Sequence, residues 1–243
     1  MHLIKLNAID STNTFLRQLS SNKSIDDFTV VVTESQLKGR GQMGTSWSSK
    51  PGKNLMASVF VDISFLAIDH SFWISMATSL AIAKTLNDFQ IRQVKVKWPN
   101  DILADQKKIS GILIENVIKN NKLQACIIGF GLNINQVYFD NLPLATSIRM
   151  VSGKWHDTDV ILKKVIENLQ LNISQLKAGD YNGIKTEYEN ELFRKEKPST
   201  FKNAKGVLFS GFIKGVSNSG HLKVLIEDNI LKEFDLKEVK LLY

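Results

Sequence analysis

The pattern of hydrophobic residues changes near residues 195–198, and this change divides the sequence into two parts. Before it, strand-like runs alternate with segments whose apolar residues recur at helical spacing. After it, only short strand-like runs remain, separated by turn residues such as Asn218-Ser219-Gly220. The sequence therefore predicts an α+β domain over residues 1–195 and a small all-β module, a β-barrel, over residues 196–243.

Periodicity also predicts the individual elements. The predicted strands of the first part are residues 3–9, 28–33, 55–63, 94–98, 107–117 and 122–133, the last two forming a hairpin. The predicted helices are residues 71–89, 157–176 and 180–193, with a further helix starting at the capping residues 10–12. The predicted strands of the second part are residues 206–216, 222–227 and 230–236. Residues 34–54 are polar and aperiodic, and a loop of that length is often functional.

Composition excludes several classes of protein. The chain has 243 residues and is 43% hydrophobic, which is enough for a sizeable core. Its formal net charge of +7 favours anionic partners such as nucleotide phosphates, an acidic acceptor protein or nucleic acid, without choosing among them. The basic residues are scattered rather than clustered, so we expect no nucleic-acid-binding tail.

The single cysteine, Cys126, excludes an internal disulfide and a thiolate metal cluster. It lies in an apolar run, so we expect a buried thiol. The N-terminal segment lacks the apolar stretch of a signal peptide, and no run is long enough to span a membrane. We therefore expect a cytoplasmic protein that does not bind membranes.

The long loop contains Gly39-Arg40-Gly41-Gln42-Met43-Gly44, which matches the spacing GxGxxG. A dinucleotide-binding turn requires a helix immediately afterwards, and Thr45–Gly52 cannot form one. What remains is a loop with exposed backbone N–H groups and one arginine, which can fold over an anionic ligand. The alternative is a surface loop whose glycines only form turns, which would have the same composition.

The segment Lys97-Trp98-Pro99-Asn100-Asp101 follows a predicted strand, which the proline ends. Asn100 can hydrogen-bond phosphate or ribose, and Asp101 can hold Mg²⁺. The alternative is a local turn in which the aspartate bonds only to its own backbone.

Two further segments combine strands with polar or glycine residues. In Lys107-Lys108-Ile109-Ser110-Gly111, a lysine can reach into a pocket and neutralise a carboxylate and an α-phosphate together, although lysines at strand ends are usually only solvated. In Gly129-Phe130-Gly131-Leu132-Asn133, the glycines indicate a close backbone approach and Asn133 can contact a nucleotide, unless this is a bulged strand end. The sequence has no HExxH, GxSxG or P-loop motif.

Taken in order, these segments resemble the biotin–protein ligase family. The matching pieces are Asp10-Ser11-Thr12-Asn13, Gln36-Leu37-Lys38-Gly39-Arg40-Gly41 with Trp47, Lys97-Trp98-Pro99-Asn100-Asp101, residues 108–115 and residues 129–133. The resemblance is strong over residues 5–135 and looser in the β-module. It implies a mixed-sheet catalytic domain like those of class II aminoacyl-tRNA synthetases and biotin–lipoyl ligases, followed by an SH3-like β-barrel.

The resemblance also implies an activity. A ligase of this kind forms biotinyl-5'-AMP and pyrophosphate from biotin and ATP, with Mg²⁺ in the substrate complex and no tightly bound prosthetic group. It then transfers biotin to a lysine of a biotin carboxyl carrier protein or domain of a carboxylase. A homodimer is compatible with this family, and the chain begins at the catalytic domain, so no DNA-binding helix-turn-helix or transcriptional role is expected.

Residue roles follow from the same resemblance. Lys108 and Arg40 are the expected catalytic cations. The expected biotin-binding residues are Ser11, Thr12, Asn13, Gln36, Gly39, Arg40, Gly41, Lys108, Gly111, Leu113, Gly129 and Gly131. The expected ATP-binding residues are Gln42, Trp47, Asn100, Asp101 and Asn133, with Asp101 also the expected magnesium ligand.

This sequence departs from the family in its loop. Where relatives often carry further arginines, it has Gln42, Met43 and Thr45, which puts its grip on phosphate in question. Two other hypotheses compete with a biotin ligase. One is a lipoate–protein ligase, and the other is a non-catalytic basic module that binds nucleic acid through exposed aromatics of the β-module.

Overall fold

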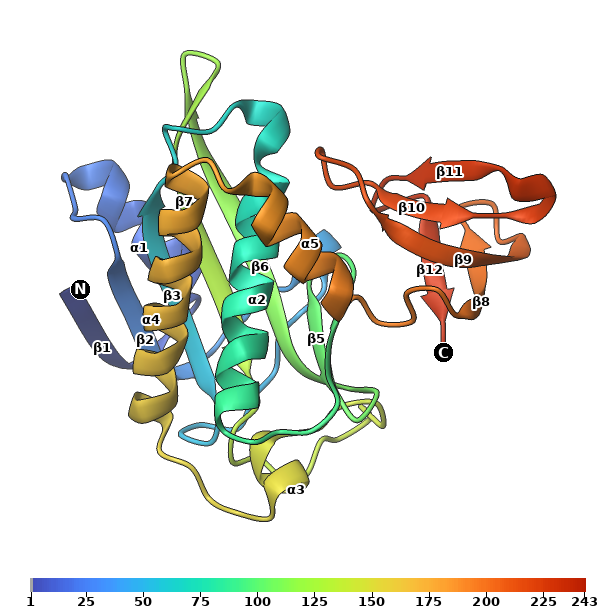
Figure 1. Ribbon diagram of the computed structural model, residues 1–243. Coiled ribbons are helices and arrows are strands. Elements are labelled where there is room, and N and C mark those ends of the chain that lie inside the picture. Colours follow the sequence, from blue (N-terminus) through green and yellow to red (C-terminus); the bar gives the residue numbers. More distant parts are fainter. Residues whose placement is uncertain (1) are drawn as a thin grey trace.

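A seven-stranded mixed sheet organises the first part of the chain (Figure 1). The computed structural model describes residues 2–243. The strands are β1 (His2–Ile9), β2 (Thr29–Gln36), β3 (Leu55–Asp62), β4 (Val94–Lys97), β5 (Asp101–Ala104), β6 (Lys107–Lys119) and β7 (Lys122–Leu132). Their order is β1-β2-β3-β7-β6-β5-β4, with β1 and β2 parallel and the other neighbours antiparallel.

Helices cover both faces of this sheet (Figure 1). They are α1 (Thr12–Asn22), α2 (Phe72–Asp88), α3 (Ile148–Ser152), α4 (Thr158–Lys177) and α5 (Tyr181–Glu191), with short 3-10 turns at Gln42–Gly44, Ile68–His70 and Glu227–Asn229. Helices α2, α4 and α5 pack against one another on one face, and α1 packs on the other against Val31 and Ile127.

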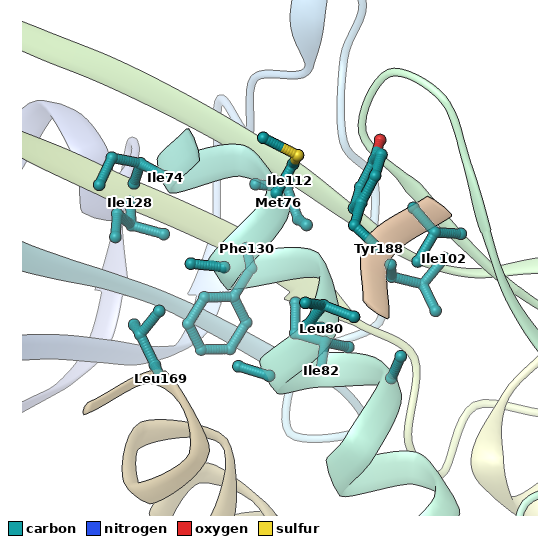
Figure 2. Close-up of a cluster of buried hydrophobic side chains, with 14 of the residues drawn as sticks. Ile74, Met76, Leu80, Ile82, Ile102, Ile112, Ile128, Phe130, Leu169 and Tyr188 are labelled. Carbon is teal, nitrogen blue, oxygen red and sulfur yellow. The ribbon is translucent and has the colours of Figure 1, made fainter. Parts of the chain in front are cut away.

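The main core lies between the sheet and helix α2 (Figure 2). Ile74, Met76 and Ile82 of α2 are completely buried, as is Ile128 of β7. Burying one such side chain stabilises the fold by roughly 1.5–3 kcal/mol. This core makes the sheet rigid, and rigid strands position the groups described below.

The C-terminal module is a five-stranded antiparallel sheet. Its strands are β8 (Pro198–Asn203), β9 (Leu208–Val216), β10 (Leu222–Leu225), β11 (Leu231–Phe234) and β12 (Val239–Leu242), in the order β11-β10-β9-β8-β12. Phe209 stacks between Phe201 and Phe234, with ring centroids 5.4 and 5.5 Å away. Phe201 and Phe234 are buried and Phe209 is half-buried, so these rings pack mainly against one another.

The module contacts the first domain through buried hydrogen bonds. The indole N–H of Trp98 donates to the carbonyl of Gly220 at 2.9 Å. The backbone N–H of Val216 donates to a carboxylate oxygen of Glu189 at 3.0 Å. The connection between α5 and β8 spans residues 192–197, and the domain boundary after residue 195 remains a prediction that falls within it.

Several elements differ from expectation. Helix α3 and strands β5, β8 and β12 were not predicted, because each is short and lies beside turn residues that interrupt its periodicity. Strand β2 continues to Gln36, inside the expected loop, because Ile9 of β1 pairs with Gln36. Burial of Cys126 is confirmed, and burial raises the pKa of its thiol far above the usual value. No helix in residues 2–243 combines the length and hydropathy that a membrane crossing needs.

Candidate active site

A cavity of about 570 Å³ opens where the two parts of the chain meet. The first domain supplies the start of α1, the end of β2, the glycine loop, the β4–β5 connection and the middle of β6 and β7. The C-terminal module supplies residues of β10 and β12. All of the predicted site residues line this cavity except Gly39 and Asn133.

At one end of the cavity, four neighbouring side chains are polar and uncharged. They are Ser11, Thr12, Asn13 and Gln36. Ser11 caps α1, and the backbone N–H and hydroxyl of Thr12 both approach Oε1 of Gln36, at 2.8 and 3.1 Å. The side-chain amide nitrogen of Gln36 donates to no group within residues 2–243, so it can donate to a ligand.

Ser58 organises this polar end, and the sequence analysis did not identify it. Its side chain is completely buried on β3, where its Oγ lies 2.7 Å from Oγ1 of Thr12 and 2.6 Å from Oδ1 of Asn13. A lone hydroxyl residue within the apolar strand Leu55–Asp62 was the available signal. A buried hydroxyl is costly unless it is hydrogen-bonded, and here Ser58 holds two site residues in place.

The glycines of β7 and β6 make room for side chains of the site itself. A Cβ at Gly129 would collide with the carboxamide of Asn13, and a Cβ at Gly131 would collide with the indole of Trp47. A Cβ at Gly111 would press on Trp47 and Lys108. The predicted close approach at these glycines is therefore present, and the groups that approach are Asn13, Trp47 and Lys108.

The opposite end of the cavity carries charge. Lys108 Nζ lies 2.6 Å from Oδ1 of Asp101, and Lys97 Nζ lies 3.2 Å from Oδ2 of the same residue. Asp101 opens β5 beside β6, so the sheet itself brings the two motifs together. Two lysines face one carboxylate here, which leaves this end of the cavity net positive for an anionic ligand.

Asn100 and Asn133 both bond to neighbouring backbone. Nδ2 of Asn100 donates to the Ile112 carbonyl at 2.8 Å, and Asn100 still lines the cavity. Nδ2 of Asn133 donates to the Thr146 carbonyl at 3.0 Å, and Asn133 lies behind the cavity wall. Within residues 2–243, no three His, Cys, Asp or Glu side chains gather into a metal-binding group. A metal ion would therefore need ligands from the substrate beside Asp101.

The glycine loop folds into a small hairpin over the cavity. The N–H of Gly41 donates to the Thr45 carbonyl at 2.6 Å, and the N–H of Trp47 donates to the Gly39 carbonyl at 2.9 Å. These two backbone donors are used inside the loop and are not exposed, contrary to expectation. The hairpin directs Trp47 inward, where its ring centroid lies 5.6 Å from Lys108 Nζ.

Arg40 does not meet Lys108 in this structure. Its guanidinium contacts Glu115 of β6 at 3.1 Å and Oγ1 of Thr14 at 3.3 Å. Both expected catalytic cations are thus paired with carboxylates, Lys108 with Asp101 and Arg40 with Glu115. An entering anion would compete with Asp101 for Lys108, whereas Arg40 uses only Nη2 for Glu115 and Thr14 and can bind an anion through its other N–H groups while it stays paired.

Comparison with known proteins decides the family. Residues 6–133 match the model described as the biotin/lipoate A/B protein ligase family, and this match spans just over half of the chain. The chain belongs to the biotin/lipoate A/B protein ligase family. This match confirms the resemblance inferred from the sequence motifs. It argues against the hypothesis that the chain is only a non-catalytic nucleic-acid-binding module.

Individual members of the ligase family are similar over most of the chain. The chain is 26% identical over 236 residues to the bifunctional ligase/repressor BirA of Bacillus spizizenii. The aligned region covers 95% of this chain and 71% of that protein. It is 28% identical over 168 residues to the biotin–[acetyl-CoA-carboxylase] ligase of Mycobacterium tuberculosis, covering 68% and 61% respectively.

A solved structure of the ligase family has the same fold. The biotin protein ligase from Aquifex aeolicus in complex with biotin and ATP superposes with a TM-score of 0.83 at 26% identity. The match covers 99% of this chain and 98% of that one, so it includes the C-terminal five-stranded sheet as well as the mixed sheet. The predicted α+β fold class is confirmed.

The C-terminal module contributes to the site of this ligase-family member, which the sequence analysis did not predict. Leu222, Leu236, Val239, Lys240 and Leu241 line the cavity. Lys97 Nζ also lies 5.4 Å from the ring centroid of Tyr243. Nothing in local periodicity indicates that these strands pack on the β4–β5 connection, because the contact joins segments more than a hundred residues apart.

Proposed function

We propose that this protein is a biotin–protein ligase. It forms biotinyl-5'-AMP and pyrophosphate from biotin and ATP, and then transfers biotin to a lysine of a biotin carboxyl carrier protein or domain. The observation that carries this proposal is that one cavity is lined both by uncharged hydrogen-bonding side chains and by the cations Lys97 and Lys108. Biotin has a matching distribution of polar groups, with a neutral ureido head and a carboxylate tail.

The polar end favours biotin over lipoate. Ser11, Thr12, Asn13 and Gln36 present hydroxyl and amide groups that suit the ureido carbonyl and N–H groups. Lipoate carries a dithiolane ring, which makes no comparable hydrogen bonds. Binding lipoate would leave these groups desolvated and unpaired, and such a mismatch discriminates strongly between ligands.

Lys108 and Arg40 are the proposed catalytic cations. In the first step a biotin carboxylate oxygen attacks the α-phosphorus of ATP, an O–P bond forms, and the bond to pyrophosphate breaks. The two reactants are both anions, so a fixed cation between them lowers the barrier. Lys108 is the residue proposed for this location, and its place in the cavity wall beside Asp101 supports the proposal.

ATP is proposed to bind as its magnesium complex on the side of Lys97, Asn100 and Asp101. One carboxylate with substrate phosphates and water is a usual ligand set for Mg²⁺, so Asp101 suits this role. Bound Mg²⁺ supplies charge neutralisation on the departing pyrophosphate. Gln42 and Trp47 of the loop line the same cavity and are proposed to contact the nucleotide. Asn133 does not line this cavity, and its contact with ATP stays a prediction.

In the second step the acceptor lysine supplies the nucleophile. Its neutral amine attacks the carbonyl carbon of the mixed anhydride, an amide bond forms, and AMP leaves. The enzyme must keep water away from the adenylate until then. The loop hairpin over the cavity suits this task, since Gly41, Met43 and Thr45 are all part of the cavity wall.

The test is ATP–pyrophosphate exchange on purified protein with Mg²⁺, comparing biotin, lipoate and no acid. We expect exchange only with biotin, followed by biotinylation of an added biotin carboxyl carrier domain. Exchange with lipoate alone would assign the protein to the lipoate branch of the family. No exchange with either acid would overturn the proposed activity.

A further inference from the structure

Glu115 lies at a junction of three segments, and neither the sequence analysis nor the reaction above gives it a role. Its side chain, on β6, is only 17% exposed. It contacts Asn13 and Arg17 of α1 and Arg40 of the glycine loop, at 2.8, 3.6 and 3.1 Å. A carboxylate largely removed from water and bonded to charged partners makes strong hydrogen bonds.

The first of these contacts orients Asn13. Nδ2 of Asn13 donates to Oε2 of Glu115 and to the Leu113 carbonyl, at 2.8 and 3.2 Å. Oδ1 of the same amide accepts from the hydroxyl of Ser58 at 2.6 Å. Because a carboxylate can only accept, Glu115 determines which end of the Asn13 amide faces β6 and which faces Ser58.

The second contact holds the loop. Two ion pairs within residues 2–243 join the loop to the rest of the chain, Arg40–Glu115 and Lys38–Asp10. In the Lys38–Asp10 pair the side chains are 78% and 51% exposed, so this pair contributes little. Arg40 is also held by Thr14 of α1. Of the two ion pairs, Arg40–Glu115 is therefore the one that holds the hairpin over the cavity, together with the packing of Trp47 against Gly131.

We propose that Glu115 is a positioning residue of the ligase, which holds the glycine loop closed through Arg40 and orients Asn13 in the acid-binding end. The proposal rests on the proposed function, since the loop and Asn13 belong to the cavity assigned to biotin and ATP. Glu115 itself does not line the cavity. It therefore acts on the adenylate only through Arg40 and Asn13.

The informative variant is Glu115→Gln, which keeps the size of the side chain and one carbonyl acceptor for Asn13 but removes the charge that Arg40 needs. We expect the loop to open more often. Biotinyl-adenylate should then leave the enzyme before transfer about tenfold faster, and the KM for biotin should rise by a similar factor. Glu115→Asp keeps the charge and should restore part of both properties.

Two measurements test the proposal. Hydrogen–deuterium exchange of residues 37–49 in the ligand-free protein reports loop opening, and single-turnover assays report the fraction of adenylate released into solution. Asp10→Asn is the matched control, because it removes the exposed ion pair of the same loop. We expect Glu115→Gln to increase both quantities and Asp10→Asn to change neither.

Unchanged loop exchange and unchanged adenylate release in Glu115→Gln would overturn the proposal, as would equal effects of Asp10→Asn. A parental protein that makes no adenylate would overturn the proposed function instead, while loop exchange would still test the ion pair. If Glu115→Gln does not fold, Arg40→Gln removes the same pair from the loop side. Loop exchange must then rise in Arg40→Gln, and the proposal fails if it does not.

Discussion

Lys108 and Asp101 lie seven residues apart in sequence and meet across β5 and β6, with Nζ of the lysine 2.6 Å from Oδ1 of the aspartate. Lys97 binds the other oxygen of the same carboxylate. Asp101 thus keeps two cations at one end of the cavity when no phosphate is bound. In the proposed ATP complex an incoming triphosphate would take over this counter-charge, so the cations would require little rearrangement to act.

Lys108→Ala should abolish most adenylation while the protein stays folded. We expect biotin-dependent ATP–pyrophosphate exchange to fall by roughly 10²–10³, the usual loss when one preorganised charge donor is removed. The side chain of Lys108 is 37% exposed and Lys97 still pairs with Asp101, so the thermal midpoint should hardly change. Lys107→Ala, at the exposed neighbouring position, is the control and should exchange normally. Near-parental exchange in Lys108→Ala would remove Lys108 from its catalytic role.

Gly129→Ala should weaken biotin binding as well as the fold. The new methyl group would displace the Asn13 carboxamide from its bonds to Ser58 and Glu115. Overpacking of this kind costs about 1–3 kcal/mol of folding free energy, and we expect the Kd for biotin, measured by calorimetry, to rise at least about tenfold. Ile128→Val, a core change of about 1 kcal/mol at the adjacent residue, is the control. Equal biotin affinity in both variants would contradict the role given to Asn13.

Trp98→Phe should loosen the C-terminal module. It leaves the Gly220 carbonyl without the buried indole donor, which costs about 1–3 kcal/mol. Trp73→Phe is a matched control, because the indole N–H of Trp73 is buried and has no partner within residues 2–243. Denaturant unfolding should show the larger loss of stability for Trp98→Phe. The opposite order would mean that packing, and not this hydrogen bond, dominates at both sites.

Stability should fall as the pH drops below the ordinary pKa of histidine because of His156. Partial burial, and then the nearby charge of Lys154, lower the pKa of His156 in the folded chain. Near and below these pKa values, the folded state therefore binds fewer protons than the unfolded state. The contribution of neutral His156 to the stability of the fold is complete above pH about 6.5, and it is lost as the pH falls through the pKa of the folded state. The difference in unfolding free energy between the parent and His156→Gln should be constant from about pH 7 to 8.5 and shrink below it. A difference that stays constant down to pH about 5 would contradict this assignment.

Long, regular hydrophobic patterns in the sequence specify most of the helices and strands and the motifs that they carry. Helix α2 and the β6–β7 hairpin were predicted because their periodicity extends over many residues. The candidate site residues were assigned from the resemblance of these motifs to the ligase family, and all but Gly39 and Asn133 line one cavity. The four-residue strands β5 and β12 were missed because neither alternates apolar and polar residues, whereas β4 of the same length does and was predicted.

Which of these groups touch depends on the tertiary structure. Sequence patterns do not reveal that Glu115 meets Arg40, that Trp47 lies over Gly131, or that the C-terminal module closes the cavity. Each contact joins segments that are brought together by strand order and register in a sheet. Local hydrophobic spacing specifies which face of a strand is buried, but the neighbour across that face depends on packing of the whole chain.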